Sequence, residues 1–242
     1  WVVVIVSLLN FAGYFLVKFI GTGKGIFLTA LLGGLISSTA VAWSFAPRGK
    51  ENPELAGSYA SGIVISSSIM FPRLALLAFI FNSDLLTDLW LPFSLMFATA
   101  IFFSWRLWRK KKKPETEQEI KIGNPLNILS ALSFGALFVG ILLTVYYAGI
   151  YLGDKGLYLS AIISGLADTD AITISMTELG GQSISAATAA MVVVTATLSN
   201  TLVKMGISIW KGGREVGRKV GTAFGSVLLV GILYVLINLI LN

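Results

Sequence analysis

Two carboxylates, Asp168 and Asp170, stand in the middle of a long apolar stretch, within the string GLADTDA at 165–171. Carboxylate oxygens bind hard cations and carry protons. A charge at membrane depth is tolerated mainly where it faces a protein interior or a water-filled path. These two residues therefore predict a functional site for a cation or a proton in a bilayer setting, with Asp168 and Asp170 as the candidate metal ligands.

The spacing of the two acids constrains the backbone that carries them. Residues two apart on a regular helix point about 200° away from each other, so both can serve one ligand only if the helix breaks. Gly165 supplies a permissive backbone nearby, as do Gly33 and Gly34 in an earlier segment. A broken helix near the midplane is one way to build an ion site. The alternative is that Asp168 or Thr169 simply caps the second half-helix.

The composition sets the class of protein. Hydrophobic residues make up 55% of the 242 residues and charged residues only 12%, and the mean hydropathy is +0.83, which indicates an integral membrane protein. There is no cysteine and no histidine, which excludes thiolate and imidazole metal sites. The net charge of +6 comes from basic residues at the ends of apolar segments, a pattern typical of membrane orientation rather than of nucleic-acid binding.

A membrane-spanning helix needs about 20 apolar residues, and this length predicts an all-α, polytopic fold with about eight segments. Their approximate ranges are 2–20, 24–45, 55–81, 88–108, 126–149, 155–177, 184–210 and 221–241. A basic, polar linker at 109–124 divides the chain into a first membrane repeat at 1–108 and a second at 125–242. The positive charge of this linker predicts that it is cytoplasmic.

The orientation of the segments contains one conflict. If all eight cross the membrane, Arg48, Lys50 and the linker share the cytoplasmic face, but Lys211 and its basic neighbours up to Lys219 lie on the other side. That arrangement contradicts the positive-inside rule. We therefore expect one segment to be re-entrant or miscounted, and segments two and six are the candidates.

The two halves of the chain are similar in sequence. A shift of 131 residues aligns 24–42 with 155–173 without a gap, and seven of these 19 positions are identical. The same shift superposes Arg73 on Lys204 and the string SST at 37–39 on DTD at 168–170. With four crossings between equivalent positions, the copies are expected to run parallel; an inverted repeat needs an odd number, which a re-entrant segment in the linker region would supply.

Other polar residues are expected to complete the site. Segment seven places Asn200 and Lys204 on one helix face, with Ser199 nearby, and segment three contributes Arg73 after Pro72. Arg73 and Lys204 either pair with the buried acids or extend to the interface. The polar shell is predicted to contain Thr169, Thr173, Ser38, Thr39, Ser199 and Asn200.

Four strings of the chain resemble a known family: GGLISSTA at 33–40, SSSIMFPR at 66–73, GLADTDAIT at 165–173 and LSNTLVK at 198–204. They are similar to the C-terminal membrane domain, of unknown function, in longer MgtC/SapB-type proteins. The resemblance implies a prokaryotic cytoplasmic membrane, an association with magnesium and an MgtC-like domain upstream. The chain opens on Trp1 inside an apolar run, so further residues are expected before it.

These observations predict a multi-pass membrane protein that moves a cation through a site between the two repeats. Mg²⁺ fits because it prefers oxygen ligands, and H⁺ or Na⁺, alone or coupled to a small solute, fits as well. The alternative is a non-transport subunit or regulator whose polar network serves helix packing and partner binding. An enzyme is not expected, because two acids two apart are a poor source of hydrolytic geometry. The lipid bilayer is the expected surrounding, with no nucleic-acid partner, and a homo-oligomer is compatible with the sequence.

Overall fold

The computed structural model describes residues 25–109 and 128–241, together with Val4, Leu8, Phe11 and Phe15. The predicted segment 2–20 thus lies outside the described residues apart from those four positions, as does the linker beyond Arg109. All regular elements described are helices: α2 (Ile26–Glu51), η1 (Pro53–Leu55), α3 (Ala56–Ser68), α4 (Met70–Phe81), α5 (Ser83–Arg109), α6 (Ile128–Leu152), α7 (Asp154–Ala167), α8 (Asp170–Leu179) and α9 (Ala186–Leu241).

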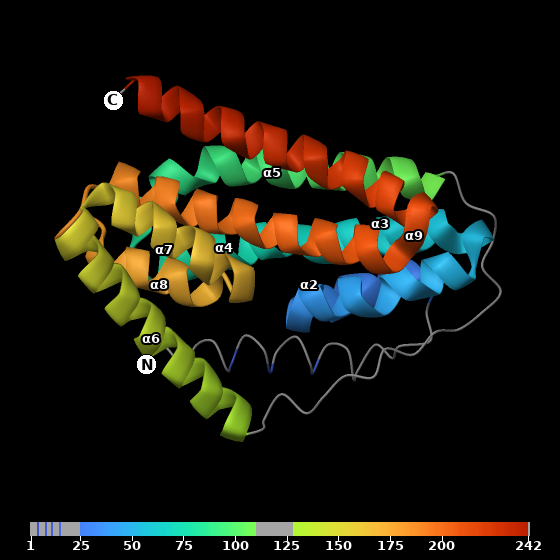
Figure 1. Cartoon of the computed structure of the whole chain (residues 1–242), viewed down its shortest axis with the longest axis horizontal. Coiled ribbons are helices and arrows are strands. Elements are labelled where there is room, and N and C mark those ends of the chain that lie inside the picture. The colour runs from blue at the N-terminus through green and yellow to red at the C-terminus, as the bar shows by residue number, and fades with distance from the viewer. Residues whose placement is uncertain are drawn as a thin grey trace.

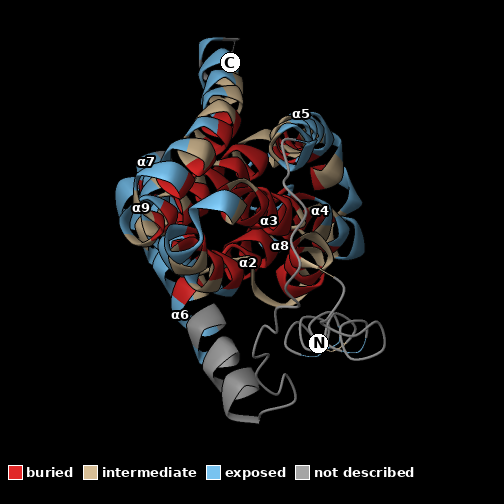
Figure 2. Cartoon of the chain, turned by 90° about the vertical axis from the view of Figure 1, so that its right-hand side faces the viewer, coloured by how far each residue is buried: buried red, intermediate tan, exposed pale blue. Residues whose placement is uncertain are grey.

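The described helices have the apolar exterior of a membrane protein. Four helical stretches, 26–51, 53–81, 83–109 and 186–238, are long and apolar enough to cross a membrane. Many large hydrophobic side chains are exposed on their outer surfaces, among them Phe79, Leu229 and Ile240. The buried residues instead gather around α2, α3 and α8 in the centre of the molecule (Figure 2). The expected helical membrane class is thereby confirmed.

Helix α2 does not run straight, because it folds back on itself at Ser37, whose backbone is extended at φ −160° and ψ 102°. A Cβ placed on Gly62 of α3 would lie 3.0 Å from Ala30 and 2.8 Å from the Phe45 ring. Ala30 and Phe45 precede and follow the bend, and on a straight helix they would be about 22 Å apart. The two halves of α2 therefore form a hairpin along α3.

Helices α7 and α8 form a second hairpin. Asp168, between them, has an extended backbone at φ −156° and ψ 153°. The start of α7 is near the start of α9, since the Tyr158 hydroxyl lies 3.6 Å from the Met191 sulfur. The end of α8 returns to the same place, where a Cβ on Gly180 would lie 3.1 Å from Ala189. With 14 and 10 residues, both helices are shorter than the about 20 residues of a spanning helix.

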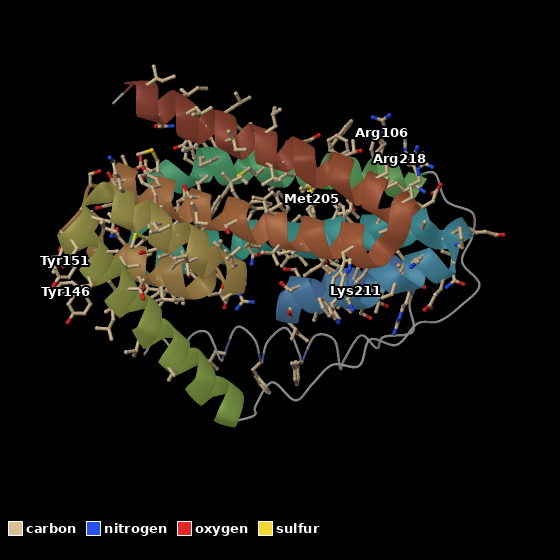
Figure 3. The ribbon with its side chains drawn as sticks, in the orientation of Figure 1. Arg106, Tyr146, Tyr151, Met205, Lys211 and Arg218 are labelled. Carbon is tan, nitrogen blue, oxygen red and sulfur yellow. The ribbon has the colours of Figure 1, made fainter. Side chains whose placement is uncertain are left out.

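The hairpins enter the molecule from opposite ends. Helix α2 both begins and ends at the basic end of the molecule. The Phe27 ring, at its start, is 6.0 Å from the Trp108 ring at the end of α5, and Lys50, at its end, lies beside the bend of α9 at Gly213. Figure 3 shows Arg106, Lys211 and Arg218 at this basic end and Tyr146 and Tyr151 at the opposite end. At the opposite end the Asn82 amide donates to the Gly180 carbonyl at 3.0 Å.

This arrangement differs from eight complete crossings. It also resolves the conflict with the positive-inside rule, in which Lys211 and its basic neighbours lay on the side opposite to Lys50. Gly213 has φ 63°, and there α9 bends so that its second half returns along the molecule (Figure 1). The bend lies beside Lys50, so the basic residues on both sides of it share one end with those of α2 and α5. Segments two and six, the two candidates for the one re-entrant or miscounted segment, both form hairpins, and each hairpin starts and finishes at the same end of the molecule.

The equivalent segments of the two halves run in opposite directions, rather than in parallel as the sequence predicted. α3 and α4 lead from the basic end to Asn82 at the opposite end, whereas the first half of α9 leads from Ala189 beside Gly180 to Gly213 beside Lys50. The parallel prediction counted segment two as a full crossing. Because α2 turns back at Ser37, it adds no crossing, and taking one crossing from the predicted four leaves an odd number, which corresponds to an inverted second copy.

Segment three is interrupted one turn before Pro72. Proline has no N–H to donate to the Ser68 carbonyl, and its ring presses against that carbonyl. The helix accordingly changes at Ile69, with α3 ending at Ser68 and α4 beginning at Met70. Ile69 itself keeps helical dihedrals at φ −61° and ψ −23°, so α3 and α4 follow one another as a single stretch.

Candidate functional site

The tips of the two hairpins form the centre of the candidate site. In the α7–α8 tip, Asp168 Oδ1 accepts hydrogen bonds from the backbone N–H of Thr169 at 2.7 Å and of Asp170 at 3.2 Å. These N–H groups open α8 and have no partner within the helix. The capping alternative for Asp168 is therefore correct for this oxygen, and the negative carboxylate also faces the positive end of the α8 dipole.

The tip of α2 is built with a hydroxyl in the equivalent position. Ser37 Oγ accepts a hydrogen bond from the backbone N–H of Ala40 at 3.2 Å, so Ser37 caps the second half of α2. Ser38 and Thr39 follow in the first turn and are half-buried. Their hydroxyls form no hydrogen bond with another residue of the described part of the chain.

Each hairpin is held close to its neighbouring helix by a glycine. A Cβ on Gly34 would lie 2.6 Å from the Ser66 carbonyl oxygen of α3, and a Cβ on Gly165 would lie 2.3 Å from the Ala196 carbonyl oxygen of α9. These distances are below van der Waals contact, so a larger residue would push the helices apart. The two glycines are equivalent under the 131-residue shift.

The predicted residues of segment seven reach the α7 backbone. Asn200 Nδ2 donates to the Gly165 carbonyl at 3.0 Å, and Ser199 Oγ donates to the Ile162 carbonyl at 2.8 Å. Gly165 is four residues before Thr169, whose N–H is held by Asp168, so its carbonyl lacks the usual helical partner. Asn200 therefore supplies the hydrogen bond that the break in the helix removes.

Arg73 joins the two hairpins. Its Nη2 forms an ion pair with Asp170 Oδ2 at the first residue of α8, and its Nη1 donates to the Leu35 carbonyl at 3.4 Å, two residues before the bend of α2. Asp170 is 5% exposed. Of the two alternatives for Arg73, pairing with a buried acid is the one observed.

Lys204 is a buried cation of a different kind. The residue is 1% exposed, and its Nζ lies 3.6 Å from the Met70 sulfur. No carboxylate within the described ranges forms an ion pair with it. Asp168 and Asp170 are close enough for their charges to act on it. Lys204 thus neither extends to the interface nor forms a direct pair, and four charged groups gather at the tips.

The remaining predicted hydroxyls divide into two groups. Thr173 is buried and donates to the Thr169 carbonyl of its own helix at 2.7 Å, so its hydroxyl is used within α8. The Thr169 side chain is buried beside the break. Sequence reasoning missed the Leu35 carbonyl and the Met70 sulfur as contacts of the two cations, because neither group carries a recognisable signal. The buried Oγ of Ser67 has no hydrogen-bond partner in the described part of the chain.

The donor set at the tips limits the metals that it could hold. Within residues 25–109 and 128–241, no group of three or more acidic side chains is gathered as a metal site would require. Asp168 and Asp170 therefore provide the acidic oxygens at the tips without a third carboxylate.

Together, the apolar exterior and the two broken hairpins define a helical membrane protein with a buried charged centre. Residues 4–212 match the family described as a domain of unknown function, DUF4010, and the chain belongs to this family. It is also 32% identical, over 201 residues, to an uncharacterized protein of Aquifex aeolicus (strain VF5), covering 82% of this chain and 87% of the relative. No solved structure matches the chain. Neither match connects the chain to MgtC or SapB, so that link stays a prediction.

Proposed function

We propose that this protein transports a small ion or solute across a membrane through the site at the two hairpin tips, with Asp168 and Asp170 binding a cation or a proton. The main support for the proposal is that two broken helices, each folded into a hairpin and entering from opposite ends, meet at Arg73. Arg73 contacts Leu35 of one hairpin and Asp170 of the other. Discontinuous helices of inverted repeats form the substrate and ion sites of many secondary transporters.

The burial of charge supports a functional role. Asp170 and Lys204 are 5% and 1% exposed in a chain whose outer surface is apolar. Ionisable groups inside membrane proteins destabilise the fold unless they are paired, and they commonly mark ion and substrate pathways. A packing role alone would be served as well by uncharged residues.

The carboxylate oxygens of Asp168 that are still open to a ligand limit which cation could bind there. Asp168 Oδ1 is occupied by two N–H groups, whereas Oδ2 accepts no hydrogen bond from a described residue. One free carboxylate oxygen suits a proton or Na⁺. Mg²⁺, the other cation considered, would bind with most of its ligands as water, because it keeps several waters in sites of this kind and a third acidic ligand is not gathered among the described residues.

The distribution of basic residues gives the orientation of the protein in the membrane. The basic end, which carries Lys50, Arg106 and Lys211, faces the cytoplasm by the positive-inside rule, and the linker at 109–124 lies on that side of a prokaryotic cytoplasmic membrane. We propose transport rather than an enzymatic reaction because Asp168 and Asp170 have separate partners, backbone N–H groups and Arg73. Two acids that hydrolyse a bond would instead share a water.

Flux into proteoliposomes tests this function. The purified chain is reconstituted with Mg²⁺-sensitive and pH-sensitive dyes, with Na⁺ and proton gradients applied in turn. We expect a flux that Asp168→Asn and Asp170→Asn abolish, while Asp84→Asn, an exposed aspartate at the start of α5, leaves it unchanged. An ion flux that persists in both site variants would contradict the assignment.

A non-transport subunit or regulator is the second candidate. It is favoured by the hydroxyls that bond within their own helices, such as Thr173 and Thr197, and by the capping role of Asp168. Absence of flux in the folded wild type under every gradient would support this candidate over transport.

A further inference from the structure

The two halves of the site differ in two charges, because Asp168 and Asp170 correspond to neutral hydroxyl residues in the first half. Under the 131-residue shift, Arg73 corresponds to Lys204 and Asp170 corresponds to Thr39. Arg73 pairs with Asp170 at the first residue of α8. The equivalent position in the second half of α2 is a neutral threonine, so Lys204 has no corresponding acid.

The register between α9 and α2 places Lys204 beside the tip of α2. The Lys211 Nζ lies 3.7 Å from the centre of the Trp43 ring, and a Cβ on Gly212 would lie 3.5 Å from Ala46. Lys50, further along α2, lies beside Gly213, further along α9, so the two helices run side by side in the same direction. Because both rise equally per residue, counting back from these three contacts brings Lys204 level with residues 36–41.

The two neighbouring acids each have a closer partner than Lys204, although one oxygen of Asp168 stays open. Asp170 is paired with Arg73, and Asp168 accepts two N–H groups at the positive end of α8. Lys204 has only the Met70 sulfur at 3.6 Å as a hydrogen-bonding neighbour in the described part of the chain. A thioether is a weak acceptor. The ammonium of Lys204 is thus the charge that lacks a strong partner.

The first turn of the second half of α2 adds donors at the same level. Helix N-termini present free N–H groups and a partial positive charge, and the Ser37 hydroxyl caps only the Ala40 N–H. The half-buried hydroxyls of Ser38 and Thr39 follow directly. An ammonium, a helix N-terminus and two hydroxyls form a set of donors suited to an oxyanion.

We propose that Lys204, Ser38, Thr39 and the first turn of the second half of α2 form a subsite for the carboxylate, or a similar oxyanion group, of the transported solute. This inference rests on the proposed function. The subsite adjoins Asp168, so a bound anion and a cation on Asp168 would neutralise each other and would bind cooperatively. Coupled movement of an anionic solute with H⁺ or Na⁺ follows from that arrangement.

Thermal unfolding of the purified full chain in detergent tests the subsite without requiring flux. Sodium acetate, sodium succinate and sodium phosphate are titrated at constant ionic strength against sodium chloride. At least one oxyanion is expected to raise the unfolding midpoint of the wild type beyond chloride. Lys204→Met should weaken the apparent affinity by about ten- to a hundredfold, as expected for the loss of a charged hydrogen bond, and Lys204→Arg should retain binding.

An exposed lysine provides the control for the loss of a positive charge, and the unfolding midpoint without anion shows whether Lys204→Met still folds. Lys155→Gln removes an exposed lysine and should leave the oxyanion effect unchanged. The Lys204→Met chain without anion should unfold at or above the wild-type midpoint, because it no longer buries a charge. No oxyanion effect beyond chloride in the wild type, or an effect that survives Lys204→Met, would overturn the subsite.

The two proposals fail in different ways. Oxyanion binding that depends on Lys204, without flux in proteoliposomes, would keep the subsite and reject transport. Carboxylate-dependent cation flux without any oxyanion effect would keep transport and reject the subsite.

Discussion

Arg73 of α4 and Asp170 of α8 form an ion pair although they are 97 positions apart in the sequence. The same guanidinium contacts the Leu35 carbonyl beside the bend of α2. Arg73 therefore holds both hairpin tips through one planar group, whose geometry suits two acceptors at once. A lysine at this position could not reproduce that arrangement.

Removal of Arg73 is expected to destabilise the fold. Arg73→Met leaves the Asp170 carboxylate buried without its partner, and breaking such a pair costs about 3 kcal/mol. The double variant Arg73→Met with Asp170→Asn should recover most of that loss, because the unpaired charge is removed as well. Thermal unfolding in detergent measures both. Glu215→Gln breaks the exposed pair with Lys219 and should leave the midpoint unchanged; equal losses in the single and double site variants would contradict the pairing argument.

The close approach of each hairpin to its neighbouring helix predicts the effect of adding one methyl group at Gly34 or at Gly165. Gly34→Ala and Gly165→Ala place a Cβ 2.6 Å and 2.3 Å from backbone oxygens of α3 and α9, and overpacking of this kind destabilises by about 1–3 kcal/mol. Gly225→Ala in the second half of α9 meets nothing within 4 Å and should be neutral or slightly stabilising. Urea or thermal unfolding of the three variants measures their stability relative to the wild type. A Gly165→Ala variant as stable as the wild type would argue against this packing.

The hairpin topology predicts which residues share a side of the membrane. Lys50, Arg218 and Tyr151 are exposed, and the chain has no native cysteine, so single cysteines at these positions can be labelled selectively. A membrane-impermeant maleimide applied to intact cells should react at Tyr151→Cys and spare both Lys50→Cys and Arg218→Cys. Eight complete crossings would instead separate Lys50 from Arg218, which makes that pair the decisive comparison.

The contact of Asn200 with the broken helix predicts a further loss. Asn200→Ala leaves the Gly165 carbonyl without the 3.0 Å hydrogen bond in a buried setting, and an unsatisfied buried group of this kind costs about 1–3 kcal/mol. Thr195→Ala, which removes a hydroxyl bonded within its own helix, should cost less. The two unfolding midpoints in the same detergent provide the test, and equal midpoints would show that the carbonyl finds another partner.

The sequence alone determined the class of protein and the position of the breaks. Composition identified a helical membrane protein, because long apolar segments have few other stable environments. The GLADTDA string predicted a broken helix since two acids two apart cannot face one ligand from a regular turn, and the backbone at Asp168 is extended. The 131-residue shift identified Ser37 as the equivalent position, and α2 bends there.

Tertiary structure decided the direction of each segment after its break. Hydropathy measures whether a stretch is apolar, and that property is the same for a helix that crosses and for a hairpin that returns. Only the packing of Ala30 and Phe45 against one glycine of α3 shows that α2 returns, and this reverses the relation between the two copies. The pairing of Arg73 with Asp170, and the isolation of Lys204, likewise depend on contacts between distant segments that no local pattern encodes.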